Sequence, residues 1–403
     1  MIKILTAYTN ELDNPEKAVA EILNQLDLDG RLLKNSAALL FSHIKFIETG
    51  ITEAVCKNLP FDTVGCTSLI FAMSTGAGME AGAAGEIMLT ATVLTSDEIT
   101  FAAGLSDPLT TENADNMVNS FYQKTASVFG GEADLVFAFP PAANRITGDV
   151  SRAALDRACN HLPVFGSLAL DLDSQNFRSP KTIFNGAAYD DRMAMLLFKG
   201  QIKPQFHRIP CSGQSIFSQD AIITAAEGNR IISINNEPAA DYIREIGLLH
   251  GDINVGSMAI PLVIADKDST ETKVVIIHNI DEDGALHCGR DLHAGGVLNI
   301  GTVTADYVLE TANILVNEIK KNENGAGVII FSCFLRCIAL GGNLTAEIEL
   351  IRRELKDYPY PYLLVSSGGE LCPEYLKPGK TANKNDEYAL IACQFQAVSE
   401  NGR

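Results

Sequence analysis

The chain has 403 residues, of which 46% are hydrophobic and 20% charged, a composition typical of a globular protein with two or three domains' worth of core. Its formal net charge is −19, with acidic residues spread along its length, which argues against nucleic acids and anionic membranes as partners. We see no secretory leader and no apolar run of membrane-spanning length, and the nine scattered cysteines are typical of reduced thiols. We therefore expect a cytoplasmic protein.

The first 200 residues predict alternating helices and strands. A strand at 2–8 precedes a helix that ends near residue 28, because Asn14 can cap it and Pro15 suits its first position. The glycine-rich stretch 75–85 predicts a flexible loop or a lid, since Glu80 and Glu86 would repel phosphate. The other expected elements are strands at 36–41, 61–66, 86–94, 98–104, 133–139, 163–167, 180–186 and 190–198, and helices at 46–57, 113–129 and 148–159.

The second half begins with a stretch that predicts mostly β structure, residues 203–300. Two hairpins are expected there, around the turns 227–229 and 281–284, with a short helix after Pro238. The helix and strand pattern of the first half then returns. Its expected elements are helices at 304–320 and 344–356 and strands at 326–331, 361–366, 371–374 and 386–394.

Three segments occupy equivalent places in this order: SAALLFSH from residue 36, ADLVFAFPP from residue 133 and GVIIFSCF from residue 327. They indicate three units of helix–strand–helix–strand–strand–strand. The expected fold class is α/β, with layered mixed sheets flanked by helices. We expect two domains: residues 1–200 with two units, and residues 201–403 with a β-rich insert and the third unit.

Small and polar residues follow the strands of these units. Since parallel strands gather their carboxyl ends at one edge of a sheet, such loops are expected to meet around a ligand. Glycines there permit close backbone approach, although ordinary turn chemistry explains each loop singly. The candidate ligand-binding residues are Gly65, Cys66, Thr67, Gly166, Ser167, Ser332, Cys333, Arg336, Gly369 and Glu370.

The chain resembles the FIST proteins of bacterial signal transduction, which carry a FIST N-terminal and a FIST C-terminal domain. In the first half the resemblance rests on VGCTS at 64–68, PVFGS at 163–167 and FNG at 184–186. In the second half it rests on FSC at 331–333 with Arg336, on Gly369-Glu370 with Pro373, and on Gly228-Asn229 before EPA at 237–239. These features span residues 30 to 395 in the family's order.

The resemblance implies a sensory module for small polar ligands, amino acids being the proposed class. The two modules use up the chain, so the signal is expected to pass to a separately encoded signalling protein. The sequence departs from the family pattern at 381–388, where Asn385 stands in place of a histidine-containing run. That departure puts a ligand role for the segment in doubt. The oligomeric state is left open.

Arg336 is the leading candidate because an arginine among apolar residues needs an anionic partner. Its guanidinium can hold a ligand carboxylate through two parallel hydrogen bonds, while Glu370 accepts from the ligand's ammonium group. The alternative is an internal ion pair of Arg336 with Glu347 or Glu370, which would only close a helix onto the sheet.

Cys333 is the alternative candidate, as the nucleophile of an enzyme that acts on a small molecule. A nucleophilic thiol needs a lowered pKa, for which His287 and His293 are the candidate activating histidines. Cysteine is also a common buried residue, so catalysis is the secondary interpretation; a scaffold without ligand is a further one. No paired Cys or His motif predicts a metal site, and no cofactor is expected.

Overall fold

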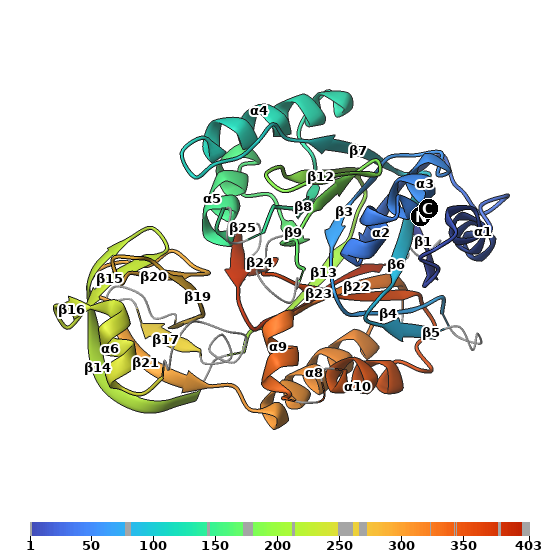
Figure 1. The fold of residues 1–403 in the computed structure, drawn as a ribbon. Helices are drawn as coiled ribbons and strands as arrows, with labels where there is room; N and C mark the ends of the chain where they lie inside the picture. Colours follow the sequence, from blue (N-terminus) through green and yellow to red (C-terminus); the bar gives the residue numbers. More distant parts are fainter. Residues whose placement is uncertain are drawn as a thin grey trace.

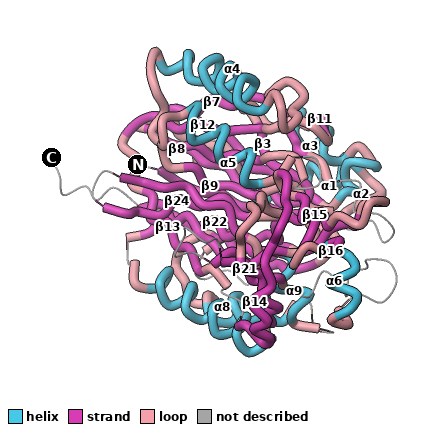
Figure 2. Tube along the Cα trace, turned by 90° about the vertical axis from the view of Figure 1, so that its left-hand side faces the viewer, coloured by secondary structure: helices cyan, strands magenta, loops and turns pink. Residues whose placement is uncertain are grey.

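The computed structural model describes residues 2–76, 82–142, 146–171, 180–211, 214–248, 261–265, 272–322, 324–341, 343, 345–377 and 380–396. Strands form the centre of the molecule and most helices lie at its rim, with α4 and α8 at opposite ends (Figures 1 and 2). The predicted α/β class is confirmed: helices flank mixed sheets.

The main body consists of three repeats with the same element order. The first contains β1 (Ile2–Thr9), α1 (Pro15–Leu26), β2 (Asn35–Ser42), α2 (Ile44–Glu48), α3 (Ile51–Lys57), β3 (Thr63–Thr67), β4 (Phe71–Ser74), β5 (Gly82–Gly85) and β6 (Leu89–Ser96). The second contains β7 (Ile99–Leu105), α4 (Ala114–Ala126), the 3₁₀ turn η1 (Ser127–Phe129), β8 (Leu135–Phe139), α5 (Gly148–Ala158), β9 (Val164–Ser167), β10 (Thr182–Phe184), β11 (Ala187–Tyr189) and β12 (Ala194–Gly200).

The third repeat is interrupted after its first strand. It contains β13 (Pro204–Ile209), then, after the insertion, α8 (Ala305–Lys320), β22 (Gly325–Cys333), α9 (Phe334–Ala339), α10 (Ala346–Glu354), β23 (Tyr362–Ser367), β24 (Glu370–Lys377), β25 (Lys380–Asp386) and β26 (Leu390–Gln396). The equivalence predicted for SAALLFSH, ADLVFAFPP and GVIIFSCF is seen in β2, β8 and β22. Each of them pairs in parallel with the next strand of its own repeat, β3, β9 or β23.

Each repeat also gives its hairpin to another repeat. The three six-stranded sheets have the orders β1-β6-β2-β3-β10-β11, β7-β12-β8-β9-β24-β25 and β13-β26-β22-β23-β4-β5. Hairpin β4–β5 of the first repeat thus completes the third sheet, β10–β11 completes the first, and β24–β25 completes the second. The exchange is cyclic, so no sheet is complete without a segment from another repeat.

The three sheets enclose one apolar core. At its centre Phe41, Phe139 and Phe331 contact one another edge to face, with ring centroids 5.4 Å, 5.6 Å and 6.4 Å apart. One phenylalanine comes from each of β2, β8 and β22. Their equivalent positions mark the approximate threefold axis of the repeats.

The insertion is a separate lobe at the side of the body, the β-rich insert (residues 214–302; Figure 1). Its antiparallel strands pack around their own apolar cluster. It contains β14 (Gln214–Glu227), β15 (Arg230–Ile234), β16 (Glu237–Pro238), α6 (Ala239–Glu245), β17 (Leu262–Ala265), β18 (Thr272–Val275), β19 (Ile277–Ile280), β20 (Leu286–Cys288) and β21 (Val297–Thr302). The division of the chain at residue 200 stays a prediction.

Several local expectations were wrong. The helix expected at 46–57 is broken at Gly50, whose φ of 74° requires a left-handed conformation. Part of the expected loop 75–85 is strand β5, while residues 77–81 lie outside the described residues. The repeat is also longer than predicted, because strands 2–8 and 98–104 were predicted but not as the opening strands of their units. The hairpin strands β4, β5, β11 and β25 were missed. The first three have only three or four residues, too few for periodicity to indicate them.

No helix in the described ranges is both long and apolar enough to span a membrane.

The phenylalanine cluster generates a stability prediction. Replacing Phe331 with alanine should lower the free energy of unfolding by about 3–5 kcal/mol, because the three sheets that meet at this ring cannot collapse independently into the cavity. Urea denaturation measures the loss. The matched control is Val128→Ala, whose side chain is 69% exposed and whose loss should stay within about 0.5 kcal/mol. Equal losses in the two variants would contradict the central role of the cluster.

Candidate functional site

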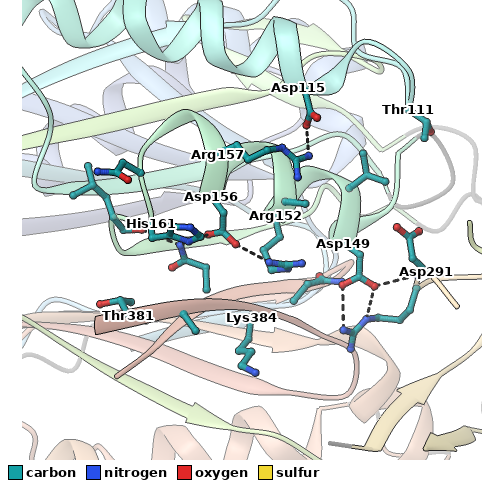
Figure 3. A pocket seen from close by; sticks show the side chains of 18 of the residues that line it. Thr111, Asp115, Asp149, Arg152, Asp156, Arg157, His161, Asp291, Thr381 and Lys384 are labelled. Carbon is teal, nitrogen blue, oxygen red and sulfur yellow. Dashed lines mark hydrogen bonds and ion pairs between the residues drawn. The ribbon is translucent and has the colours of Figure 1, made fainter. Parts of the chain in front are cut away.

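Two cavities lie beside the β-rich insert. The larger, of about 1140 Å³, separates α5 and β25 from the end of the insert (Figure 3). Its charged side chains are largely engaged with one another: Arg157 pairs with Asp115, and Arg152 Nη1 lies 2.6 Å from Asp156 Oδ2. Because these charges already satisfy one another, the cleft offers few unmet polar groups to a ligand.

The same cleft contains the main polar attachment of the insert to the body. Arg290 donates two hydrogen bonds to Asp149, at 3.0 Å and 3.1 Å, and the backbone N–H of Asp291 donates a third. Burial would raise the pKa of Asp149, but the adjacent Arg290 guanidinium lowers it below its ordinary value. Asn385, from the segment that departs from the family pattern, donates to the same carboxylate at 3.3 Å. Asn385 therefore supports this attachment.

The smaller cavity, which we call the junction pocket, has a volume of about 80 Å³ and lies where the insert meets the loops after β8, β9, β22 and β23. A water molecule needs about 10–15 Å³ on this measure, so the pocket has room for several waters or for a small molecule. Its lining residues are Ala142, Ala169, Leu170, Asp171, Pro180, Ile276, His278, Cys333, Phe334, Leu335, Ile338, Ser367, Gly368 and Glu387.

His278 and Glu387 give the junction pocket its distinctive chemistry. His278 Nε2 is buried without a hydrogen-bond partner among the described residues, and it lies 3.9 Å from Glu387 Oε1, beyond hydrogen-bond distance. The other oxygen, Oε2, accepts from the backbone N–H of Ile276 at 3.1 Å. Glu387 thereby connects the turn between β25 and β26 to the insert.

The backbone around Glu387 is shaped to admit its carboxyl group. A side chain at Gly289 would place its first carbon 1.7 Å from Glu387 Oε1 and 2.8 Å from His278 Nε2. A larger residue there would have to displace the Glu387 carboxyl group.

Burial leaves both groups uncharged near neutral pH. It raises the pKa of Glu387 to about 8, although Arg290 and the Ile276 N–H act in the opposite direction. It lowers the pKa of His278 to about 4, and His287 adds to that effect. A protonated acid next to a neutral imidazole can donate and accept hydrogen bonds, which suits the recognition of a small polar group.

Arg336 lies outside the junction pocket, fully buried, with internal partners for its whole guanidinium. Nε donates to Glu347 Oε1 at 3.0 Å, and the two terminal nitrogens donate to the carbonyls of Tyr388 and Val308 and to Thr311 Oγ1. Ser332 donates to the other oxygen of Glu347 at 2.6 Å. These contacts are the internal ion pair that the sequence left open. A ligand role for Arg336 and Ser332 stays a prediction that the contacts do not favour.

Glu370 forms no ion pair with Arg336 among the described residues. Neither of its two buried carboxyl oxygens has a hydrogen-bond partner of good geometry there, although the Ser367 hydroxyl and the Cys333 thiol lie near enough to favour its charged form. Burial raises the pKa of Glu370 well above its ordinary value, partly opposed by the Ser367 hydroxyl. Glu370 does not line the junction pocket, whereas the neighbouring Ser367 and Gly368 do.

Cys333 does line the junction pocket, but its thiol is protonated. Burial, reinforced by Glu370, raises the pKa of Cys333 well above the ordinary value. His287 and His293, the expected activators, are elsewhere: His287 Nε2 lies 2.9 Å from Asp281 Oδ1, and His293 lines the larger cleft. All nine cysteines are buried thiols, and each of them has a raised pKa. Such a thiol is a poor nucleophile.

The remaining sequence candidates lie in the layer of loops below the pocket. Ser167 Oγ lies 2.9 Å from Ser367 Oγ, whose hydroxyl donates to the Gly369 carbonyl at 2.7 Å. These contacts bring the second and third repeats together directly under the pocket floor. Gly369, with φ at 151°, permits the tight turn before Glu370.

Four further candidates, three from the first repeat and Gly166 from the second, contribute to packing. An added carbon at Gly65 or Gly166 would come within 2 Å of the backbone of the neighbouring strand, at Leu40 O or Ala138 O. Cys66 is buried, which raises its pKa to about 12. Thr67 accepts from the Lys181 backbone N–H at 2.8 Å. None of the four lines the junction pocket, so a ligand role for them stays a prediction.

Sequence reasoning missed His278, Glu387 and Asp171. His278 and Glu387 are 109 positions apart and stand in segments that predict strands and turns, with no local motif around them. The sequence does place Gly289 near two histidines and a cysteine, which could have drawn attention to this segment. Only the structure shows that Gly289 makes room for the Glu387 carboxyl group. In the described part of the chain no three His, Cys, Asp or Glu side chains cluster as a metal site would require.

Comparisons with known proteins give the chain a family. Residues 36–237 match the model of the FIST N domain, and residues 239–373 match the model of the FIST C domain. The chain belongs to the FIST family. FIST domains are sensory domains of signal-transduction proteins, and they bind small ligands.

Other comparisons add little to the FIST assignment. No curated protein shows significant similarity to the chain. Among solved structures, a crystal structure of cyanuric acid hydrolase from A. caulinodans aligns with 98% of this chain and 99% of that chain, at 7% identity and a TM-score of 0.36.

The two FIST regions meet at the junction pocket. Ala142, Ala169, Leu170, Asp171 and Pro180 come from the FIST N region. Most of the other lining residues come from the FIST C region, and Glu387 follows it. A molecule in this pocket would contact both regions at once.

The Arg336–Glu347 pair generates a second stability prediction. Replacing Glu347 with alanine should cost about 3–5 kcal/mol, because it leaves a buried guanidinium without its counter-ion. The control is Glu354→Ala, which breaks the exposed pairs with Arg353 and Lys320 and should cost less than about 1 kcal/mol. Chemical denaturation compares them. A small loss for Glu347→Ala would mean that Arg336 does not depend on this carboxylate.

The raised pKa of Glu387 generates a prediction about pH. Between its ordinary value of 4.5 and about 8, folded Glu387 holds a proton that the unfolded chain lacks, so stability falls as pH rises through this window. Since His278 titrates with a pKa of 6.5 when unfolded and about 4 when folded, its contribution changes mainly below pH 6.5. From pH 6.5 to 8, the wild type should therefore lose about 1.5 kcal/mol relative to Glu387→Gln. The free energy of unfolding of both proteins is measured in urea across this pH range. If it changes equally with pH in the wild type and in Glu387→Gln, the raised pKa of Glu387 is contradicted.

Proposed function

We propose that this FIST protein is a cytoplasmic sensor that binds a small polar metabolite, an amino acid or related zwitterion, in the junction pocket. Binding would change how the β-rich insert sits against the three-repeat body. A separately encoded signalling protein would then recognise the altered arrangement.

One observation carries the proposal: a cavity at the meeting point of both FIST regions is lined by a buried imidazole that lacks a hydrogen-bond partner among the described residues. That atom is His278 Nε2, and Glu387 Oε1, 3.9 Å away, is beyond hydrogen-bond distance of it. Buried polar groups are costly unless something bonds to them, so water or a ligand is expected there. The sensory character of FIST domains supports the ligand.

The same site suggests how binding is transmitted. Glu387 touches the pocket and also accepts the Ile276 N–H of the insert. A ligand that forms a hydrogen bond or an ion pair with the Glu387 carboxyl group would change the strength of the hydrogen bond from Ile276 and so the attachment of the insert. A conformational equilibrium can respond only to such a difference in affinity between two arrangements.

The two alternatives have less support. A nucleophilic role for Cys333 requires a thiolate, and burial keeps that thiol protonated. A ligand-free scaffold would fill this junction with apolar side chains, whereas the junction contains a cavity of about 80 Å³.

A thermal-shift and calorimetric screen of the amino acids tests the proposal. At 100 times its dissociation constant a true ligand should stabilise the protein by about 2.7 kcal/mol. Ala142→Leu, which adds three carbons to the pocket wall, should abolish that gain. The matched control Ala187→Leu lies on the exposed part of β11 and should leave it unchanged. Folding of both variants is checked by circular dichroism. If no amino acid binds at millimolar concentration, the proposal fails.

A further inference from the structure

The ionisable groups that line the junction pocket are two acids and one imidazole. Its lining includes the acids Asp171 and Glu387 and the neutral imidazole of His278, and no lysine or arginine of the described chain lines it. Arg336, the guanidinium that sequence analysis assigned to a ligand carboxylate, makes its contacts with Glu347 and three other groups outside the pocket. The described lining can thus offer a carboxylate to a cation once Glu387 loses its proton, and it offers no cation to a ligand carboxylate.

The rest of the wall is apolar. Much of it comes from Leu170, Ile276, Leu335 and Ile338, with Phe334 and the small side chain of Ala169. A carboxylate that entered would lose its hydration and gain no counter-charge, which is strongly unfavourable. A short alkyl chain would instead bury its surface favourably against these side chains.

Glu387 is placed to hold the cation. One of its oxygens is fixed by the Ile276 N–H at 3.1 Å, and the other makes no hydrogen bond among the described residues. The 3.9 Å gap between that oxygen and His278 Nε2 is too long for a direct hydrogen bond. A donor with two or three N–H groups can reach both atoms, and a primary ammonium has three.

We propose that the junction pocket recognises a small primary amine with an apolar tail, through the Glu387 carboxylate and His278 Nε2, and that a carboxylate on the ligand is unnecessary. This inference rests on the proposed function, because it names the ligand class of the same pocket. Of the two charged groups of a zwitterionic ligand, only the ammonium group is then required for recognition.

The binding step includes one proton transfer. A ligand that arrives as an ammonium ion meets protonated Glu387, whose O–H bond breaks; the proton leaves to solvent, and the carboxylate accepts an ammonium N–H. One proton is released for each ligand bound, and the charge inside the pocket stays balanced. Below the pKa of Glu387, affinity for the ammonium ion therefore rises about tenfold for each pH unit.

Other groups near Glu387 do not titrate with it in the tested range. Arg290 and Asp149 form a charged pair, and His278 stays neutral above about pH 4. Cys288, Cys333 and Tyr388 face the same region, and burial raises the pKa of each. Asp171 shares the pocket, and its own response is measured by the variant Asp171→Asn.

The experiment compares three probes on the full chain at pH 7 by isothermal titration calorimetry: alanine, ethylamine and propionate. We expect ethylamine to bind, alanine to bind more weakly because its carboxylate must stay in water at the open side of the pocket, and propionate not to bind. In Glu387→Gln the amide oxygen can still accept the Ile276 N–H, so the fold is retained while affinity for ethylamine falls at least tenfold. The matched control Glu282→Gln, on the exposed turn after β19, should bind as the wild type does.

A second readout is the proton count. Titrations of ethylamine in buffers with different ionisation enthalpies should report about one proton released per ligand in the wild type and none in Glu387→Gln. Binding of alanine without ethylamine, binding of propionate, or full affinity in Glu387→Gln would overturn the inference while leaving the sensor proposal intact. Failure of all amino acids and amines to bind would overturn both.

Discussion

The fold depends on the cyclic exchange of hairpins among its three repeats. Each sheet is closed by two strands that another repeat supplies, so the parallel pairs β2–β3, β8–β9 and β22–β23 are held at fixed positions around one axis. The ring of Phe41, Phe139 and Phe331 fills that axis. Because the loops after these strands cannot move independently, they give the junction pocket a rigid floor. The insert is attached to this body by the polar contacts of Asp149 and Glu387 and by an apolar cluster that includes Val274 and Ile276.

The chain stabilises its buried ionisable groups in two opposite ways. Arg336 keeps its charge and receives a complete set of partners, which makes it part of the scaffold. Glu387 and His278 lose their charges and keep unused hydrogen-bonding capacity. Without a ligand, the arrangement of Glu387 and His278 contributes less to the stability of the fold than the fully paired Arg336 does. Unmet capacity in a buried site is a common property of binding sites, whereas a fully paired ion is a common property of cores.

Features of this structure that depend on residues close together in the sequence were predictable, and features that depend on distant segments were not. Apolar runs and the Asn14 cap are local, so β2, β8, β22 and α1 were predictable. The sequence also showed that Arg336 lies in an apolar segment and needs an anionic partner. That this partner is Glu347 and not a ligand depends on how α10 packs against the sheet. Glu387 and His278 come together only through the insert and the last turn of the third repeat. A single sequence contains no local pattern that relates those two segments. The residues predicted from the sequence lie on the loops around and below the junction pocket, and a ligand role for them stays a prediction.

The burial of all nine thiols gives this protein a built-in reporter. In the folded state each cysteine is shielded and protonated, so a thiol reagent can react only when the surrounding structure opens. The thiols are distributed over the three repeats and the insert. The rate at which each cysteine is modified therefore reports how often the structure around that cysteine opens. Cys333 stands apart because it lines the junction pocket. Its rate of alkylation therefore measures how often the pocket is exposed, and an occupant would slow it without any change at the other eight.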